Sequence, residues 1–252
     1  MKVFLHGFMG DPLVWHSLRT PGSLAPVLLG HDALAEAENV TSFEDEVARL
    51  SRLIQANRSG PLHLIGYSLG ARVALGIAAT VPIERLTLIS GRDGLSDETE
   101  REQRVQQDER WAVRLEACTD PRSFSEFLVQ WDAQPVFQAR TVSADSKGLA
   151  RRLAHDPKRL AAAMRVLSLG RMPVYAPRVR CGRVDVIAGA GDPKFSELAG
   201  PLAASLNGTL TIVADAGHDL PREASDALAR LLLNGDENDK FADRYGSARH
   251  RT

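Results

Sequence analysis

The sequence contains little cysteine, and this scarcity argues against two kinds of protein. Cys118 and Cys181 are its only cysteines in 252 residues. They lie far apart and in no spacing that a metal site uses, so we expect neither a disulfide framework nor a cysteine-based zinc site. We predict two free thiols and a reducing compartment.

Long apolar runs and a dominant charge are also absent. No apolar stretch reaches the length of a membrane span, and the run at Val3–Leu5 is too short for a signal-peptide core. Lysine and arginine total 31, and aspartate and glutamate 32, which gives a formal net charge of -1. This balance favours neither nucleic acid nor an anionic membrane as a partner. We expect a cytoplasmic protein, and its oligomeric state stays open.

What is present is the composition of an ordinary folded domain, with 44% hydrophobic and 25% charged residues. Short apolar runs, typical of buried parallel strands, alternate with helical patterns over Ser42–Ala56 and Leu69–Thr80. This alternation predicts an α/β fold, with a mostly parallel sheet flanked by helices. The predicted strands are Lys2–Leu5, Leu62–Ile65, Arg85–Ile89, Val184–Ala188 and Thr209–Val213, with Val27–Leu29 as a further candidate.

From about Asp93 to Pro177 the alternation stops, and the sequence becomes charged and helical. We interpret this stretch as a helical cap inserted between two strands of the core. The core then comprises residues 1–92 and 178–233, the cap residues 93–177, and a polar tail residues 234–252. The helices predicted in the cap are Asp97–Ala117, Ser123–Trp131, Ser146–Ala154 and Pro157–Leu169.

A G-x-S-x-G pattern at residues 66–70 lies between a predicted strand and a predicted helix. In that context the turn is a nucleophile elbow, which holds Ser68 in a strained backbone conformation above the start of the helix. His6-Gly7-Phe8 follows the first strand, where such enzymes place one donor of an oxyanion hole. We therefore predict that the backbone N–H groups of Phe8 and Leu69 form this hole.

The other two members of a catalytic triad should follow the serine in the order acid, then histidine. Asp192 ends a glycine-rich loop after a predicted strand and is the predicted acid, with Asp93 as the alternative. His218 lies in the loop after the last strand and is the predicted base. The histidines expected to be structural or solvated are His31, His63, His155 and His250.

Arginines mark the predicted entrance to the site. Arg72 lies one helical turn after Ser68, and the predicted cap carries several more. Arginine binds carboxylates through two parallel hydrogen bonds, so a pocket lined by arginines suits a polycarboxylate better than an apolar acyl chain. The cap arginines are Arg101, Arg104, Arg110, Arg151, Arg152 and Arg171, of which Arg101 and Arg110 are expected on a solvated face.

The chain resembles the 2-succinyl-6-hydroxy-2,4-cyclohexadiene-1-carboxylate synthases of menaquinone biosynthesis, which are members of the α/β-hydrolase superfamily. The matching segments span nearly the whole chain up to the tail. The stretch from Trp131 to Phe137 and the arginine after the serine turn are more particular than the turn itself. The segments are Phe4–Gly10, Gly66–Arg72, Ile89–Gly91, Gly94-Leu95, Gln134–Phe137, Leu167–Arg171 and Gly191–Phe195.

The resemblance implies an α/β-hydrolase fold and a carbon–oxygen lyase. Such an enzyme eliminates pyruvate from 2-succinyl-5-enolpyruvyl-6-hydroxy-3-cyclohexene-1-carboxylate, a small polycarboxylate, without a metal or an organic cofactor. Triad-activated serine would act as a base on a ring proton. The family's site residues fall here on Ser68, Asp192 and His218 for the triad, and on Tyr67, Arg72, Arg104, Trp131 and Arg152 for substrate binding.

The chain departs from the family pattern at two positions. Asp132 stands where the family usually has tyrosine, and Ala71 replaces a glycine in the serine turn. Because an inward-pointing Asp132 would repel a polyanionic substrate, we expect its side chain to point elsewhere. The alternative function is a serine esterase or carbon–carbon bond hydrolase that uses the same triad covalently. A non-catalytic binding protein is disfavoured, since all three triad residues are present.

Overall fold

A computed structural model describes residues 1–31, 39–137 and 146–232 of the chain, so the predicted tail lies outside the described residues. Its centre is a five-stranded, fully parallel sheet in which neighbouring strands follow the order of the sequence. All five of the main predicted strands are present, which confirms the α/β fold. The strands are β1 (Lys2–Leu5), β2 (His63–Tyr67), β3 (Ile83–Ile89), β4 (Cys181–Gly189) and β5 (Thr209–Val213).

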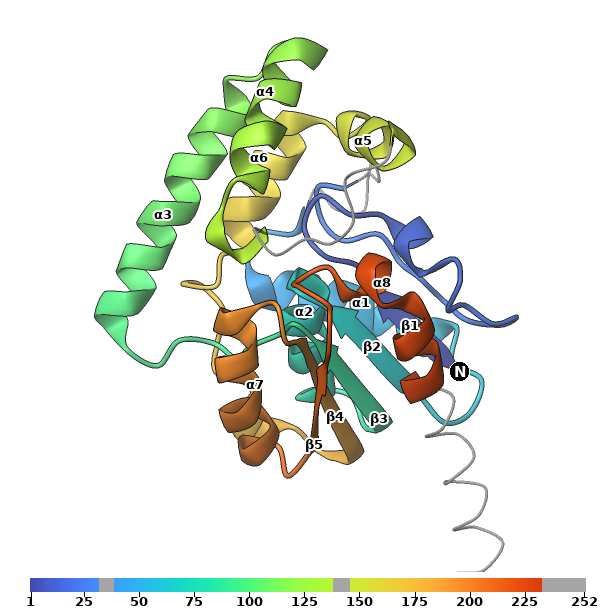
Figure 1. Cartoon of the computed structure of the whole chain (residues 1–252). Coiled ribbons are helices and arrows are strands. Elements are labelled where there is room, and N and C mark those ends of the chain that lie inside the picture. The colour runs from blue at the N-terminus through green and yellow to red at the C-terminus, as the bar shows by residue number, and fades with distance from the viewer. Residues whose placement is uncertain (32–38, 138–145, 233–252) are drawn as a thin grey trace, which may run out of the picture.

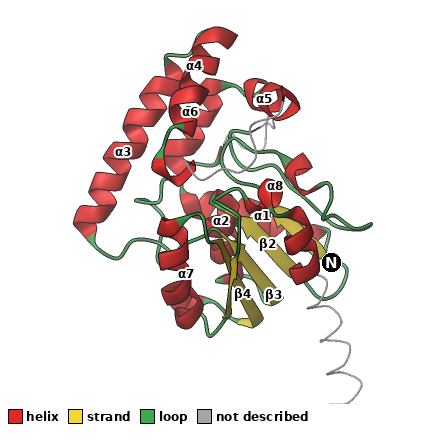
Figure 2. Ribbon diagram, viewed as in Figure 1, coloured by secondary structure: helices red, strands yellow, loops and turns green. Residues whose placement is uncertain are grey.

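Helices cover both faces of this sheet (Figure 2). Along each strand the side chains alternate between the faces, as the pleat of a strand requires. Leu64 and Leu86 belong to an apolar cluster that also contains side chains from residues 43–54 and 69–78. Ile65 and Ile89 belong to the cluster on the other face, which contains side chains from residues 220–232. The covering elements are α1 (Phe43–Ala56), α2 (Leu69–Ala78), α7 (Pro193–Ser205), α8 (Leu220–Glu223), and the 3-10 turns η1 (Pro12–Trp15) and η4 (Ala176–Arg178).

Four further helices lie between β3 and β4 in the sequence and gather on one side of the sheet (Figure 1). They have an apolar cluster of their own, which includes Leu115, Phe127 and Leu160 together with Met9 from the loop after β1. No strand occurs among the described residues of this segment. The elements are α3 (Glu98–Glu116), α4 (Pro121–Asp132), the 3-10 turn η3 (Pro135–Phe137), α5 (Ser146–Leu153) and α6 (Pro157–Val166).

This arrangement matches the helices predicted for residues 93–177, while the division into a core and a cap stays a prediction. One expectation about the segment is wrong. Arg101 does not lie on a solvated face, because its guanidinium donates to the backbone carbonyls of Leu95 and Met172 at 3.2 and 3.1 Å. Of the helices that the structure describes, none combines the length and apolar character needed to cross a membrane.

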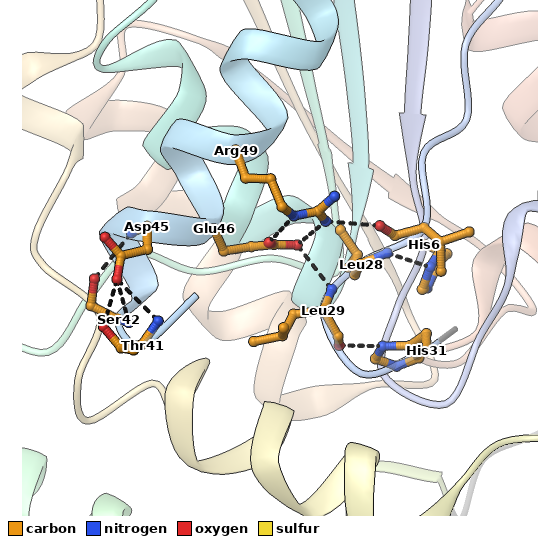
Figure 3. Close-up of polar contacts among 10 residues, drawn as sticks. His6, Leu28, Leu29, His31, Thr41, Ser42, Asp45, Glu46 and Arg49 are labelled. Carbon is orange, nitrogen blue, oxygen red and sulfur yellow. Dashed lines mark hydrogen bonds and ion pairs between the residues drawn. The ribbon is translucent and has the colours of Figure 1, made fainter. Parts of the chain in front are cut away.

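The predicted strand Val27–Leu29 is wrong, and side chains explain why. Only Leu24 forms a bridge with β1, and residues 25–28 then run on without a strand partner. The buried Glu46 accepts the backbone N–H of Leu29 at 2.9 Å, and Arg49 donates to the carbonyl of Val27 at 3.0 Å (Figure 3). Helix α1 thus supplies the hydrogen bonds that a neighbouring strand would have provided.

Three histidines pack together beside this loop. The ring centroids of His6 and His31 are 4.9 Å apart, and those of His31 and His155 are 5.4 Å apart. His6 Nε2 accepts the backbone N–H of Leu28 at 3.2 Å, and His31 Nε2 accepts that of Met9 at 2.9 Å. Burial lowers the pKa of all three side chains. His31 and His155, the two histidines of this group that were predicted to be structural or solvated, therefore connect the loop after β1 to the segment between α5 and α6.

Lowering the pH from 7 to 5 should destabilise the protein. Burial lowers the pKa of His6 to about 4 and that of His63 to about 3, whereas an unfolded chain binds these protons near pH 6.5. In the window between these values the unfolded state binds more protons than the native state. The free energy of unfolding should then fall with falling pH, by about 1.4 kcal/mol per pH unit for each such histidine.

Urea denaturation followed by circular dichroism at pH 7, 6 and 5 measures this dependence. His63→Gln provides the matched comparison, because it removes a titrating ring whose Nε2 contacts Thr87 Oγ1 at 2.9 Å, away from the predicted site. This variant should lose less stability between pH 7 and 5 than the unchanged chain. Equal losses in the two proteins would contradict the prediction.

Gly70→Ala should destabilise the fold by more than about 3 kcal/mol. A Cβ atom at Gly70 would lie 2.2 Å from the carbonyl oxygen of Leu5, and neither backbone can yield without moving β1 or α2. The control is Gly200→Ala in α7, where a Cβ atom meets nothing within 4 Å and should stabilise the helix by up to about 1 kcal/mol. Thermal unfolding of both variants is the measurement, and similar midpoints would refute the steric explanation.

Candidate active site

Ser68 occupies the turn between β2 and α2 with a backbone φ of 53° and ψ of -109°. A positive φ is unfavourable for a residue with a side chain, so the surrounding packing must hold it in place. Its N–H donates to the carbonyl of Ile89 at the end of β3, at 2.9 Å. A Cβ at Gly66 would lie 2.4 Å from the carbonyl oxygen of Gly70, so only glycine permits this approach of strand and helix.

The structure brings the three predicted triad residues together. Ser68 Oγ lies 3.0 Å from Nε2 of His218, and Nδ1 of His218 lies 2.6 Å from Oδ2 of Asp192. The side chains of His218 and Asp192 are 4% and 1% exposed, so the pair is shielded from water. With Nδ1–H donating to the carboxylate, Nε2 is the acceptor for the serine hydroxyl. This is the geometry that activates a serine oxygen.

Backbone and aromatic contacts fix the orientation of the His218 ring. Ser90 Oγ donates to the carbonyl oxygen of His218 at 3.0 Å. The rings of Tyr67, Phe137 and Phe195 surround the imidazole, with centroids 5.6, 5.7 and 4.6 Å away. Tyr67, predicted to contact substrate, is itself buried and packs beside His218.

The alternative acid, Asp93, has a different task. Its carboxylate accepts the backbone N–H groups of Gly94, Tyr175 and Ala176 at 2.8 to 2.9 Å. These bonds join the two points at which the chain leaves β3 and returns toward β4. Because this carboxylate already binds three backbone N–H groups and Asp192 binds His218, the structure favours Asp192 as the acid of the triad.

Two backbone N–H groups next to Ser68 remain available for a ligand. Within the described residues, neither Phe8 N–H nor Leu69 N–H has a hydrogen-bond partner. Leu69 is the first residue of α2, where N–H groups point out of the helix. The carbonyl on the other side of the Phe8 peptide, Gly7 O, is held by His6 Nδ1 at 2.8 Å and by Gly10 N–H at 3.0 Å. Two predicted oxyanion donors thus have the environment that this role needs.

A cavity of about 170 Å³ opens beside Ser68 and His218, beneath the helices of residues 93–177. We call this cavity the cationic lobe. Arg72 and Arg104, both predicted to bind substrate, line it, and so does Trp131. Lys194, which the sequence reasoning did not single out, is a third cation on its wall.

The positive charges of the cationic lobe are only partly neutralised. Arg104 pairs with Asp108 at 2.9 Å, whereas Arg72 and Lys194 have no carboxylate partner in ion-pair range within the described part of the chain. Arg72 donates instead to the carbonyl of Leu167 at 2.9 Å. Burial and the nearby Arg104 lower the pKa of both Arg72 and Lys194. An anionic ligand would relieve this repulsion, so the lobe is built to receive negative charge.

A second cavity meets the first at Ser68, His218 and Trp131, and we call it the Arg152 lobe. Its other walls include residues 7–10, together with Tyr67 and Arg222. Arg152, predicted to bind substrate, is present there, but Asp132 already occupies its guanidinium at 2.7 and 3.0 Å. Asp132 itself is not among the residues that line either cavity, although it pairs with Arg152, which does. The expectation that Asp132 points away from the site therefore stays a prediction.

The residues that the prediction missed could have been found from their neighbours. Lys194 and Phe195 follow Asp192 by two and three residues, within a segment of the family resemblance. Phe137 ends another such segment and contacts both Trp131 and His218.

Within the described residues, no group of three or more histidine, cysteine, aspartate or glutamate side chains is placed to hold a metal ion.

Comparisons with known proteins show to which family the chain belongs. The family model described as Alpha/beta hydrolase family matches residues 3–231. The 2-succinyl-6-hydroxy-2,4-cyclohexadiene-1-carboxylate synthase of Serratia proteamaculans is 31% identical over 242 residues, 92% of this chain and 91% of its own. The protein of the same name from Citrobacter koseri is 31% identical over 242 residues, with 91% and 92% covered.

Among solved structures, that of MenH from S. aureus is similar with a TM-score of 0.86 and 25% sequence identity, covering 95% of this chain and 94% of that one. The match of fold, length and sequence is therefore consistent across a family model, named relatives and a solved structure. The chain belongs to the α/β-hydrolase family and, within it, to the 2-succinyl-6-hydroxy-2,4-cyclohexadiene-1-carboxylate synthases, and it is an enzyme with the lyase role of that family in menaquinone biosynthesis.

Proposed function

We propose that the enzyme eliminates pyruvate from 2-succinyl-5-enolpyruvyl-6-hydroxy-3-cyclohexene-1-carboxylate, with Ser68 as the general base. One observation carries this proposal. Arg72 and Lys194, which lack a carboxylate partner within the described residues, line the same cavity as the hydrogen-bonded Ser68 oxygen. An activated serine beside unneutralised cations suits a substrate that is both acidic at carbon and rich in carboxylates.

The triad supplies the base. His218 Nε2 accepts the hydroxyl proton of Ser68 while the serine oxygen takes a proton from the substrate ring. The imidazolium that forms is stabilised by Asp192, 2.6 Å from Nδ1. The electron pair left on carbon moves into the ring, the carbon–oxygen bond to the enolpyruvyl group breaks, and pyruvate leaves as its enolate. Protonation of that enolate by His218 returns the triad to its starting state.

The oxyanion hole supports the same step. Removing a proton next to the succinyl carbonyl places negative charge on that oxygen, and Phe8 N–H and Leu69 N–H are the donors proposed to receive it. Neither has another partner within the described residues, and Leu69 adds the positive end of α2. Donors that are already oriented stabilise the developing charge without reorganisation.

Ser68→Ala should abolish pyruvate release, lowering kcat/KM at least about a thousand-fold, because the base and its proton relay are lost together. Ser51→Ala in α1, at a position that lines neither lobe, serves as the control and should match the unchanged enzyme. A coupled assay that follows pyruvate from the enolpyruvyl substrate is the measurement. Release within ten-fold of the unchanged enzyme would refute the role of Ser68.

The same preparations distinguish the alternative hydrolase function. An esterase or carbon–carbon bond hydrolase would turn over p-nitrophenyl esters and leave a covalent acyl group on Ser68, detectable by mass spectrometry of the intact chain. The lyase needs no bond between substrate and serine. A trapped acyl-enzyme without pyruvate release would favour the hydrolase.

Lys194→Gln should raise KM about ten-fold or more and lower kcat less, because the lysine is proposed to bind a substrate carboxylate in the ground and transition states alike. Lys158→Gln, an exposed position at the start of α6, is the matched loss of one positive charge and should leave KM unchanged. Steady-state kinetics at low and high salt test this difference. Equal KM values for the two variants would contradict the proposed role of Lys194.

A further inference from the structure

The two lobes that meet at Ser68 differ in net charge. In the cationic lobe, Arg72 and Lys194 face the cavity without a carboxylate partner among the described residues. In the Arg152 lobe, the positive charges have acidic neighbours. Arg152 pairs with Asp132, and Arg222 lies 3.8 Å from Asp219. A ligand that spans Ser68 therefore meets strong positive charge on one side only.

The Arg152–Asp132 pair has the geometry that a bound carboxylate would have. Nη1 and Nη2 of Arg152 donate to separate oxygens of Asp132, at 2.7 and 3.0 Å. The Arg152 side chain is 7% exposed, and that of Asp132 is 29% exposed. A guanidinium offers such a paired edge to one carboxylate at a time, so Asp132 and a ligand carboxylate compete for it.

The position of Arg152 does not depend on Asp132 alone. Nη2 of Arg152 also lies 3.8 Å from Sδ of Met9 in the loop after β1. The neighbouring Arg151 contacts Asp11 at 3.4 Å, which attaches α5 to the same loop. The guanidinium would thus stay in the lobe if the negative charge of Asp132 were removed.

We propose that Asp132 is a specificity-determining residue that occupies Arg152 and makes the Arg152 lobe reject a second carboxylate. The cationic lobe then receives the carboxylates of the substrate, and the Arg152 lobe receives its less charged part. This consequence for the substrate rests on the function proposed above, whereas the charge selectivity of the lobe does not. Removing the charge of Asp132 would turn the same lobe into an anion site.

Binding of small carboxylates to the full chain tests the inference without any turnover. The probes are the α,ω-dicarboxylates from glutarate to suberate and the monocarboxylates of the same lengths, titrated by calorimetry. Asp132→Asn should bind at least one dicarboxylate ten-fold more tightly than the unchanged chain does, with monocarboxylate affinities within three-fold. Asp132→Ser, which also removes the charge, should show the same gain.

A double variant shows whether the gain passes through Arg152. Adding Arg152→Gln to Asp132→Asn should return the dicarboxylate affinity to that of the unchanged chain. Glu126→Gln removes an exposed charge from the same helix, where Glu126 pairs with Arg122 at 3.1 Å, and should produce no gain. Dicarboxylates that bind no more tightly to either Asp132 variant, or a gain that persists without Arg152, would overturn the proposal.

The outcome is separable from that of the proposed function. If Asp132→Asn gains dicarboxylate affinity while the unchanged enzyme releases no pyruvate, the charge selectivity stands and the proposed substrate falls. If pyruvate is released but neither variant gains affinity, Asp132 serves only to join α4 to α5, and the inference falls alone.

Discussion

At the carboxyl ends of β1 and β2, the backbone of α2 packs directly against the backbones of both strands, with no side chain between them. Gly70 lies against the last carbonyl of β1, and Gly66 lies against the first turn of α2. This contact brings α2 close enough to β1 for Phe8 and Leu69 to line the same cavity as Ser68. The strained conformation of Ser68 follows from it, since a strand and a helix so close together leave the turn no relaxed path.

The three triad residues lie in loops that follow three different strands of the sheet. Asp192 follows β4, His218 follows β5, and Ser68 follows β2, so the parallel sheet delivers all three side chains to one edge. The cations around that edge come from both parts of the chain: Arg72 from α2 and Lys194 from α7, and Arg104 from α3 and Arg152 from α5. The sheet therefore places the three triad side chains together, and helices of both the sheet layer and the segment between β3 and β4 place cations beside them.

The sequence predicted those parts of the structure that local patterns determine. Short apolar runs between helical patterns located all five strands, and the order of serine, acid and histidine located the triad. The sequence patterns did not reveal contacts between segments that lie far apart in the chain. Val27–Leu29 has the composition of a strand, but Glu46 and Arg49 from α1 take its hydrogen bonds.

Charge interactions across the fold limited the prediction of the site in the same way. Asp132 and Arg152 are twenty residues apart, and nothing in their local sequence reveals that they pair. The burial of His31 and His155 likewise depends on a loop and a helix that meet only in three dimensions. Lys194 was within reach, because it adjoins the acid of the triad, and a search for cations next to each triad residue would have found it.

The carboxylate of Asp93 has a consequence for how this architecture can diversify. By binding the N–H groups of Gly94, Tyr175 and Ala176, it holds the outgoing and returning ends of the helical segment side by side. A segment whose two ends are fixed together can change in length or sequence without shifting the strands to which it is attached. Side chains that these helices place around the cavity can therefore vary while the sheet and the triad that it positions stay as they are.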